Sequence, residues 1–543
     1  MNREENGRDP NCNMSRRNND KKTIHFHIFA ILMIATPLIL AGIVACFYAI
    51  RDGVVPVPGM KWNDEAQYYQ LIKTTVETGS PVGYWGFNGN HAIVGTGGAW
   101  SPAIIWPYAV FAYLFPMSKG LVYFVNLFYI TAANVIFYLC VKPGKGQCIK
   151  LALAQATSVL FIVYLSVNMS EIFRYGVAIV LAGLLYQMMF RESPKIVKYV
   201  IAPVAIIGAV QIYTFFAFCV PIYVFALMKK NKLWQKLLVS AASMGVVAVG
   251  SYYLLHLISS NYNIHKTETL LNAVKSLDIP GAVMAFLRMM KQGMTDVFHL
   301  WTYVYSYPMI PFQVLLGIVL VAVSVVLLAI FLYKRNRKKE TCISGHDAVI
   351  ACVTVYSIIL FYLMYMTLYS IDPFTFVRGT YIVVIFCMYL MAMCEHKWLY
   401  RGILIFQAVG LLFLPATMDY YMTGHYTTAE EDAQWKELEA DVALAVQADE
   451  SLGPWENTIA MYTMEPKAIC ALPAGMGVNF IMEDGVLPEE AGYLFLSVIP
   501  AEKQSSEWIV RDYGKFLEQY GEVLESEYSV VYEDGSYIIY RRK

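Results

Sequence analysis

An acidic pair, Asp64-Glu65, opens the stretch of the sequence whose residue types most directly indicate chemistry. Asn63 or Asp64 is a natural helix N-cap, and the pattern through Glu77 is helical until a glycine ends it. Carboxylates at a helix start have two interpretations. They stabilise the positive end of the helix dipole, or they are the acid–base groups of a reaction site. The residues alone leave both interpretations open.

A loop rich in glycine and aromatic residues follows the acidic pair. Its two parts are Gly83–His91, which includes Trp85, and Gly95–Pro102. Glycines let a backbone approach a ligand closely, and aromatic rings stack on a sugar or a lipid headgroup. A plain tight turn explains Gly95–Gly98 equally well. This segment is not a phosphate-binding loop, because no strand precedes it and no Lys-Ser/Thr follows it.

Two further motifs place charged residues at the borders of apolar runs. Ser170-Glu171-Ile-Phe-Arg174 precedes one run, and Arg378 opens another. Ionisable groups at membrane depth are costly and are functional candidates by default. For Glu171 and Arg174 the alternative is a local i,i+3 ion pair at a helix start. For Arg378 the two interpretations are bidentate binding of a lipid phosphate and snorkelling to ordinary headgroups.

The composition predicts a membrane protein. Of 543 residues, 57% are hydrophobic and only 15% are charged, and the mean hydropathy is +0.47. Apolar stretches of about 17–25 residues recur, which is the length that a helix needs to cross a hydrocarbon core. They are continuous rather than alternating, which predicts helices and not a barrel. We therefore expect a polytopic α-helical membrane protein with the lipid bilayer as its partner and no nucleic-acid partner.

Basic loops predict how the chain is oriented. Lysines and arginines cluster in short loops at 142–150, 191–198, 229–232 and 334–339. The positive-inside rule places these loops in the cytoplasm, together with the N-terminus. Residues 1–24 are polar and rich in asparagine and are predicted to be a disordered cytoplasmic segment. The predicted location is the plasma membrane.

About eleven spans place every one of these basic loops in the cytoplasm. They lie near 28–50, 121–141, 151–168, 175–190, 199–213, 214–228, 233–258, 312–333, 347–369, 376–394 and 401–420. The stretch 199–228 must fold back as two short helices, or its flanking basic loops would not both lie inside. We interpret residues 101–117 as a helix that dips into the outer leaflet, because a full span there would place 142–150 outside.

The predicted topology divides the rest of the chain into two domains. Residues 25–420 form a transmembrane domain with a long first outer loop at 51–119, and residues 421–543 form an acidic extracytoplasmic α/β domain. From Tyr421 onward, 23 Asp/Glu and 8 Lys/Arg give a net charge of −15. The patterns predict helices at His265–Leu277, Gly281–Met294, Ala429–Asp449 and Trp508–Tyr520, and strands at Thr458–Thr463, Val478–Met482, Tyr493–Val498, Tyr528–Tyr532 and Tyr537–Tyr540.

Cysteine and histidine spacing indicates no fixed cofactor. Ten cysteines are scattered, mostly inside apolar runs, and no CxxC pair occurs, so neither a disulfide framework nor a zinc site is indicated. The outward histidines lack metal-ligand spacing. The sequence requires no cofactor, and a divalent metal held by Asp64, Glu65 and Glu171 stays open.

The first outer loop resembles that of a known family. Asp64-Glu65-Ala-Gln-Tyr68-Tyr69, an acidic pair opening a helix after the first span, is similar to the motif of the GT-C superfamily of membrane glycosyltransferases. Protein O-mannosyltransferases and the aminoarabinose transferase of lipid A belong to that superfamily. Its members have a similar number of spans, a cytoplasmic N-terminus, amphipathic helices in the first loop and often a C-terminal outer domain. The likeness in architecture covers most of the chain, whereas the motif is only a few residues long.

The resemblance implies an activity and roles for the residues. A sugar would pass from a polyprenyl-phosphate donor to an extracytoplasmic acceptor, which is a cell-envelope glycan, a lipid or a protein. By position, Asp64 would be the general base or the acceptor-orienting carboxylate, with Glu65 beside it. Glu171 would be the second acidic site, and Arg378 the arginine near the lipid phosphate. The further donor-binding candidates are Arg174, Lys61, His91, Tyr68 and Trp85.

One departure from the family leaves the sugar and the acceptor open. The loop Gly86–Pro102 does not match the proline-rich loop of the mannosyltransferase branch. The alternative functions are an envelope polysaccharide polymerase or ligase, a non-catalytic membrane protein, and a transporter. A transporter is typically built from inverted repeats with polar residues near the bilayer midplane, whereas the polar residues here cluster at one face.

Overall fold

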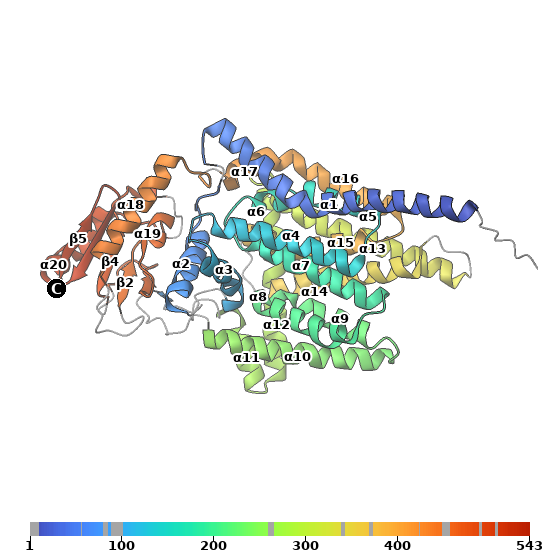
Figure 1. The fold of residues 1–543 in the computed structure, drawn as a ribbon. Helices are drawn as coiled ribbons and strands as arrows, with labels where there is room; N and C mark the ends of the chain where they lie inside the picture. The colour runs from blue at the N-terminus through green and yellow to red at the C-terminus, as the bar shows by residue number, and fades with distance from the viewer. Residues whose placement is uncertain are drawn as a thin grey trace, which may run out of the picture.

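A helical bundle with a small sheet at one end makes up the structure, a computed structural model (Figure 1). It describes residues 10–55, 57–79, 85–87, 101–258, 265–337, 343–368, 373–422, 424–447, 457–487, 491–504 and 509–543. Helices α2 (Asn63–Thr78) and α3 (Pro102–Leu114) lie between the bundle and the sheet. We call this end of the bundle the sheet end, and the opposite end, where short basic loops join the helices, the basic end.

Seven segments of the described chain are long and apolar enough to cross a membrane. They belong to α1 (Pro10–Asp52), α4 (Leu121–Val141), α7 (Glu171–Phe190), α10 (Leu233–Ile258), α13 (Met309–Asn336), α14 (Gly345–Leu368) and the run of α16 (Lys397–Val409), η5 (Gly410–Phe413) and α17 (Leu414–Met422). Each segment is long enough to cross the hydrocarbon core and has apolar side chains to face it. A helix also satisfies its own backbone polar groups, which lipid cannot do. The chain is therefore a polytopic helical protein.

The remaining predicted spans coincide with bent or shorter apolar helices. An eighth candidate is the pair α5 (Lys145–Ala156) and α6 (Val159–Leu165), bent by 70°. Ser158 sits at the bend and caps α6 by accepting a hydrogen bond from the backbone N–H of Phe161. The three shorter segments are Val197–Ile212, Thr214–Leu227 and Thr375–Met391, which contain η1 (Val197–Ile201), α8 (Ala202–Ile212), η2 (Thr214–Phe218), α9 (Cys219–Leu227) and most of α15 (Pro373–Met391).

The stretch from Val197 to Leu227 folds back on itself, as the basic loops on both sides predict. The break falls at Tyr213, whose backbone is extended between α8 and the turn that follows. Tyr223, near the end of α9, donates a hydrogen bond to the carbonyl of Lys198, near the start of the first segment. The two short helices thus form an antiparallel pair whose ends both lie at the basic end.

Two helices of the second long loop pack at the sheet end. They are α11 (His265–Lys275) and α12 (Ile279–His299), followed by the turn η4 (Leu300–Val304). The carboxylate of Asp278 caps α12 by accepting from the N–H of Gly281. Ala285, Met289 and Gly293 form the buried stripe of α12, which packs on α14. The predicted surface helices are thus present, and α12 runs further than predicted at its C-terminal end.

The sheet has six strands in the order β1-β3-β2-β4-β6-β5. Strands β1 (Trp85–Phe87), β3 (Gly477–Phe480), β2 (Thr458–Met461) and β4 (Tyr493–Ser497) are parallel, while β6 (Tyr537–Arg542) and β5 (Tyr528–Glu533) form an antiparallel hairpin on β4. The helices of this unit are α18 (Ala429–Ala445), α19 (Pro466–Ala471) and α20 (Tyr513–Glu527), with the turn η6 (Ala501–Lys503).

Two features of this unit differ from the sequence-based expectation. Strand β1 comes from the first loop, so the sheet extends beyond the predicted division at residue 421. Helix α20 begins later than the predicted Trp508–Tyr520, because the carboxylate of Asp512 caps it by accepting from the N–H of Lys515, and it also ends later, at Glu527. Residues 505–508 lie outside the described chain.

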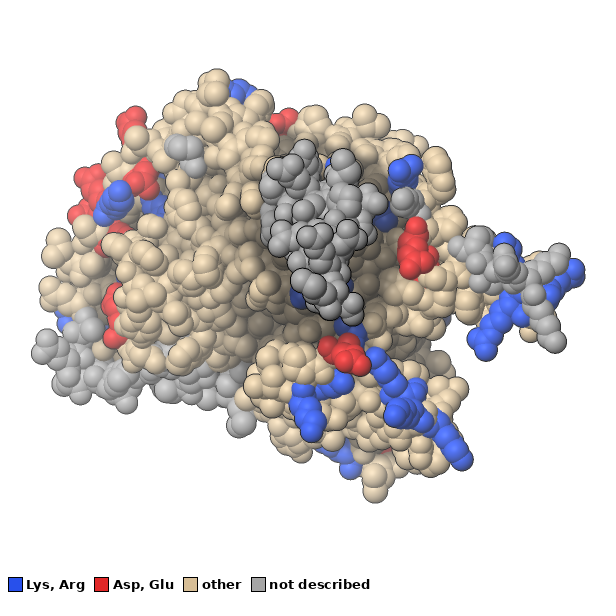
Figure 2. Space-filling view, turned by 45° about the vertical axis from the view of Figure 1, so that its right-hand side comes forward, with Lys and Arg blue, Asp and Glu red and all other residues tan. Residues whose placement is uncertain are grey.

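Charge is segregated along the bundle. Figure 2 shows lysine and arginine side chains gathered toward the end turned to the viewer, and acidic side chains mostly over the end that carries the sheet. The short loops after α4, α7, α9 and α13 carry lysines and arginines. This is the asymmetry on which the positive-inside rule rests.

Candidate functional site

An ion pair at the sheet end joins two helix starts that are far apart in the sequence. Asp64 lies in the first turn of α2, and Arg378 lies near the start of α15. Nη2 of Arg378 donates a hydrogen bond of 3.1 Å to Oδ2 of Asp64. The Asp64 side chain is 25% exposed and the Arg378 side chain 21% exposed, so an approaching ligand can reach both.

Glu171 sits behind this pair and links it to a second arginine. Its Oε1 lies 3.6 Å from Nε of Arg378 and 3.7 Å from Nη1 of Arg174. The Glu171 side chain is only 2% exposed. Together with Asp64, these residues make a compact group of two carboxylates and two guanidinium groups, which we call the Asp64 cluster (Asp64, Glu171, Arg174 and Arg378).

Two buried polar atoms of the cluster have no hydrogen-bond partner in the described chain. They are Oε2 of Glu171 and Nε of Arg174. A buried polar atom left unsatisfied costs about 1–3 kcal/mol, and native proteins rarely tolerate one without a functional reason or an ordered water. An acceptor and a donor facing the same group of charges are suited to a ligand that carries both hydroxyl and anionic oxygens.

Tyr68 connects Arg174 to α2. Its hydroxyl accepts a hydrogen bond from Oγ of Ser170 at 2.9 Å and lies 3.4 Å from Nη2 of Arg174. Burial raises the pKa of the Tyr68 phenol, so the hydroxyl stays protonated. The guanidinium of Arg174 also stands over the ring of Tyr213, 5.0 Å from its centroid. Arg174 is therefore held in place by side chains from three elements.

Glu65 points away from the cluster and is fully buried. Its Oε2 accepts from the backbone N–H groups of Lys61 and Trp62 at 2.9 and 3.0 Å, and its Oε1 accepts from that of Asn168 at 2.8 Å. Nε2 of His425 lies 2.9 Å from Oε2. Three backbone N–H groups therefore satisfy this carboxylate, and the His425 ring lies beside it. The geometry therefore gives Glu65 a positioning role at the start of α2.

Asn168 completes this support. Its side-chain amide donates to the carbonyls of Pro58 and Gly59 at 3.0 and 2.7 Å, and its Oδ1 accepts from the N–H of Tyr123. The turn that precedes α7 is thereby fastened to the loop that precedes α2. Asp64 and Glu171 are brought together by these contacts. Asn168 is thus a supporting residue that the sequence-based prediction of the site does not include.

The C-terminal unit also holds α2. Nε2 of Gln70 donates to the carbonyls of Leu472 and Pro473, both at 3.1 Å. Nζ of Lys73 lies 2.6 Å from Oε1 of Glu439 on α18. Helix α2 packs on α3 on one side and on α19 on the other. The helix that carries Asp64 is thus clamped between the bundle and the sheet.

The other predicted site residues lie at varying distances from the cluster. Nζ of Lys61 donates to the carbonyl of Tyr420 at 3.2 Å, at the edge of the site. Trp85 lies in β1 and pairs with Val478, which carries it onto the sheet. His91 lies outside the described residues.

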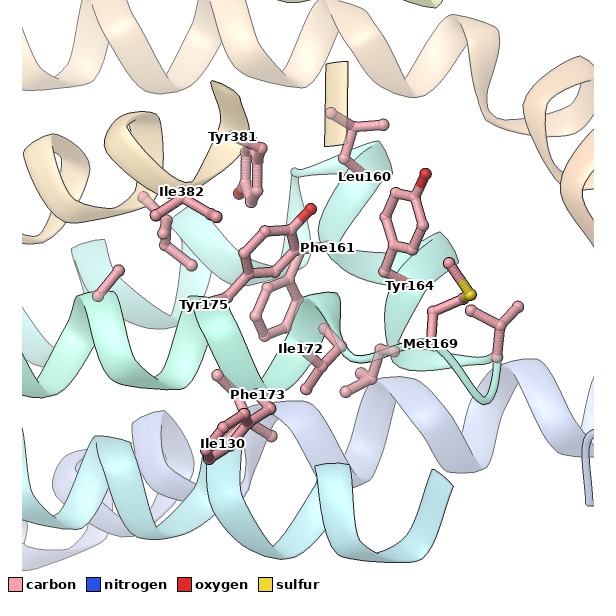
Figure 3. Close-up of a cluster of buried hydrophobic side chains, with 14 of the residues drawn as sticks. Ile130, Leu160, Phe161, Tyr164, Met169, Ile172, Phe173, Tyr175, Tyr381 and Ile382 are labelled. Carbon is pink, nitrogen blue, oxygen red and sulfur yellow. The ribbon is translucent and has the colours of Figure 1, made fainter. Parts of the chain in front are cut away.

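Aromatic residues lie beside the cluster, and the sequence-based prediction does not include them. The hydroxyl of Tyr175 donates to the carbonyl of Arg378 at 3.1 Å. Figure 3 shows Tyr164 and Tyr175 on neighbouring elements, with Tyr381 facing Tyr175. The ring centroids of Tyr175 and Tyr381 are 5.0 Å apart. The spacing of Tyr175 four residues after Glu171 is a signal for it, because residues at i and i+4 share a helix face.

Metal ligands do not gather at this site. Within the described ranges, no group of three or more His, Cys, Asp or Glu side chains is placed to hold a metal ion. The two carboxylates of the Asp64 cluster face arginines, and Glu65 faces backbone N–H groups. The cluster is thus equipped with fixed positive charge from guanidinium groups.

Comparison with known proteins finds similarity among solved structures. No protein-family model matches the sequence, and no curated protein does. The chain is similar to the crystal structure of ArnT from Cupriavidus metallidurans bound to undecaprenyl phosphate, with 12% identity, a TM-score of 0.38, and coverage of 94% of this chain and 97% of that one. It is also similar to ArnT from the same organism in the apo state, with 13% identity, a TM-score of 0.35 and the same coverage.

Proposed function

We propose that this chain is a GT-C-type membrane glycosyltransferase that moves a sugar from a polyprenyl-phosphate donor to an extracytoplasmic acceptor. The observation that carries the proposal is the Asp64 cluster. Two arginines and two carboxylates meet at one end of a polytopic bundle, and the most exposed pair of the four is Asp64 with Arg378. Phosphate recognition and proton removal from a hydroxyl call for these two kinds of group.

The lipid phosphate is the ligand that suits the arginines. A planar guanidinium binds phosphate oxygens through two parallel hydrogen bonds, which gives both energy and orientation. The Asp64–Arg378 pair is partly exposed and is joined by one hydrogen bond. A phosphate, which offers two acceptor oxygens to a guanidinium, can replace Asp64 as the partner of Arg378. That exchange would free the Asp64 carboxylate.

An apolar groove beside the cluster suits the hydrocarbon part of the donor. It has a volume of about 260 Å³ and lies between α4, α7 and α8. Phe173 and Val177, which flank Arg174 on α7, line it, and so do the small residues Gly176 and Gly208. Ile212 lies at its α8 wall, directly before the Tyr213 ring that contacts Arg174. A lipid tail in this groove would place its phosphate near the arginines.

The proposed chemistry needs one proton acceptor and one stabilised leaving group. An acceptor hydroxyl forms a bond to the anomeric carbon, and its proton passes to the Asp64 carboxylate. The bond between the anomeric carbon and the phosphate oxygen breaks, and its electron pair leaves with the lipid phosphate. Arg378 and Arg174 stabilise the charge of that anion. The Oε1 atom of Glu171 holds both arginines in position, and its Oε2 atom has no hydrogen-bond partner among the described residues.

The charge distribution supports an orientation of the chain with the proposed site outside the cytoplasm. The basic loops lie at the end of the bundle away from the Asp64 cluster. With those loops in the cytoplasm, the site and the acidic C-terminal unit are extracytoplasmic in the plasma membrane. The donor lipid reaches the site from the outer leaflet.

A comparison of lipid extracts and surface glycans tests this function. We expect a strain that lacks the gene to accumulate one polyprenyl-phosphate sugar and to lose that sugar from its envelope, as measured by mass spectrometry. The wild-type gene should reverse both changes, and Asp64→Asn should reverse neither. Asp52→Asn, which changes an exposed acid at the sheet end that pairs with its neighbour Arg51, is the matched control and should behave as wild type. Identical lipid and glycan profiles with and without the gene would reject the proposed function.

A further inference from the structure

A second cavity, lined by aromatic residues, lies next to the Asp64 cluster, because Val377 in its lining directly precedes Arg378. It has a volume of about 60 Å³ and lies between the start of α13, α15 and α17. Tyr307, Tyr420 and Tyr421 line it together with Thr417 and Val377. At roughly 15 Å³ for each water, the space holds about four waters. This suits part of one sugar ring and not a longer saccharide.

The tyrosines form a continuous aromatic wall. The ring centroids of Tyr307 and Tyr420 are 4.7 Å apart, and those of Tyr420 and Tyr421 are 5.1 Å apart. Both contacts are edge-to-face, so neighbouring rings turn in different directions and cover more than one side of the space. Aromatic rings offer an apolar face with a negative quadrupole, which suits the C–H face of a sugar.

This wall touches both helix starts that carry the ion pair. Val377 lines the cavity and directly precedes Arg378. The ring of Tyr421 contacts that of Trp62 at 5.6 Å, and Trp62 lies two residues before Asp64. The carbonyl of Tyr420 accepts a hydrogen bond from Nζ of Lys61. A group bound in the cavity therefore lies next to a phosphate on Arg378.

The lining also restricts the charge of the occupant. Among the described residues that line the cavity, none carries an acidic or basic side chain. A charged substituent placed there would lose water without gaining a partner, which is strongly unfavourable. Hydroxyl groups meet no such penalty, because Ser306 and the tyrosines bring hydroxyls to the lining.

We propose that this cavity is the donor-sugar subsite and that it takes an uncharged sugar ring. The proposal rests on the function proposed above and adds to it a place for the ring and a restriction on its chemistry. Tyr307, Tyr420 and Tyr421 are the specificity-determining residues. The phosphate stays with Arg378 and Arg174.

Binding of two lipids that differ only in the sugar tests the subsite. The purified full chain in lipid nanodiscs is titrated with decaprenyl phosphate and with decaprenyl-phosphate glucose. We expect Tyr307→Leu and Tyr420→Leu to weaken binding of the glucose-bearing lipid up to about tenfold and to leave binding of the bare lipid phosphate unchanged. Tyr305→Ala is the control, because this neighbouring residue is 95% exposed and does not line the cavity. Arg378→Gln should weaken binding of both lipids.

Each other outcome overturns a defined part of the account. Equal weakening of both lipids by the tyrosine variants, or no weakening of either, would reject the sugar subsite while the phosphate site stands. Tighter binding of a decaprenyl-phosphate amino sugar than of the glucose lipid would reject the restriction to uncharged rings. A wild-type chain that binds neither lipid would reject the proposed function itself.

Discussion

Each end of the bundle carries a carboxylate at a helix start, but the two differ in burial and in the groups that they face. At the basic end, Asp347 lies in the first turn of α14 and is 1% exposed. It accepts from the backbone N–H groups of Glu395 and His396 at 2.9 and 3.1 Å and lies 3.2 Å from Nδ1 of His346. At the sheet end, Asp64 is partly exposed and is held by the side chain of Arg378.

Asp347 is held by backbone groups and has a structural role, whereas Asp64 is held by a side chain and can exchange that partner for another. Backbone N–H groups are fixed by the helices and turns that contain them, so Asp347 cannot change partners without local unfolding. An arginine side chain can rotate to a new partner. Lys150 reinforces the fixed arrangement, because its Nζ donates to the carbonyls of Ala392 and Cys394 in the same turn. The contacts at the basic end therefore hold neighbouring spans together, whereas the proposed site at the sheet end has an ion pair between side chains that can exchange partners.

The largest expected effect on transfer comes from Asp64→Asn. The amide cannot accept the proton of the acceptor hydroxyl, so transfer should fall by about 10²–10⁴-fold, the usual contribution of a general base. The measurement is transfer of labelled sugar by membranes that contain the variant. Its Tm in detergent should stay close to wild type. Retention of full transfer would contradict the role of Asp64.

Arg378→Gln should have the next largest effect. It removes a charge-assisted bidentate contact to the phosphate and leaves Asp64 and Glu171 without a shared cation. We expect a rise in KM for the lipid donor, with a fall in kcat because the leaving phosphate is less stabilised. Arg378→Lys keeps the charge and should restore part of the binding but not the bidentate geometry. A KM unchanged in both variants would place the phosphate elsewhere.

Glu65→Gln separates the two members of the acidic pair. Its carboxylate satisfies backbone N–H groups and faces His425, so the amide should lower the free energy of unfolding by about 1–3 kcal/mol. Transfer should fall only as far as the position of Asp64 is disturbed. Thermal unfolding and kcat measured on the same preparation check this. A loss of transfer as large as that of Asp64→Asn, without loss of stability, would give Glu65 a chemical role.

Asp347→Asn should have the smallest effect on transfer. It weakens hydrogen bonds to two backbone N–H groups and to His346, so we expect a lower Tm and a loss of about 1–3 kcal/mol of stability. The kcat of the folded fraction should be unchanged, since Asp347 lies at the opposite end of the bundle from the site. A selective loss of kcat at normal Tm would show that the comparison between the two ends is wrong.

Local patterns in the sequence were enough to predict most of the elements. Continuous apolar runs located the long described helices of the bundle, because length and hydrophobicity are properties of the segment itself. The helix after Asp64 and the hairpin at Asp534-Gly535 also follow from local signals. The bend at Ser158 and the start of α20 at Asp512 were missed, since a single capping residue decides each.

The site could be predicted only in part, because contacts between segments far apart in the sequence decide its arrangement. The pairing of β1 with β3 joins segments separated by nearly the whole chain, and no local pattern encodes it. The sequence-based prediction also places Asp64 and Glu65 side by side in one site. Neighbouring residues on a helix point about 100° apart, since a turn takes 3.6 residues, so one faces Arg378 and the other faces Asn168 and His425. Which of the two faces the site depends on tertiary packing.

The affinity of Asp64→Asn for a lipid phosphate tests the central claim most directly. The claim is that Arg378 leaves Asp64 to bind the phosphate of the donor. Titration of the full chain in nanodiscs with decaprenyl phosphate measures this, without any need for the sugar or the acceptor. We expect Asp64→Asn to bind at least as tightly as wild type, because Arg378 is already released, and Arg378→Gln to bind more weakly. If Asp64→Asn loses affinity as strongly as Arg378→Gln, the two residues do not exchange partners and the account is contradicted.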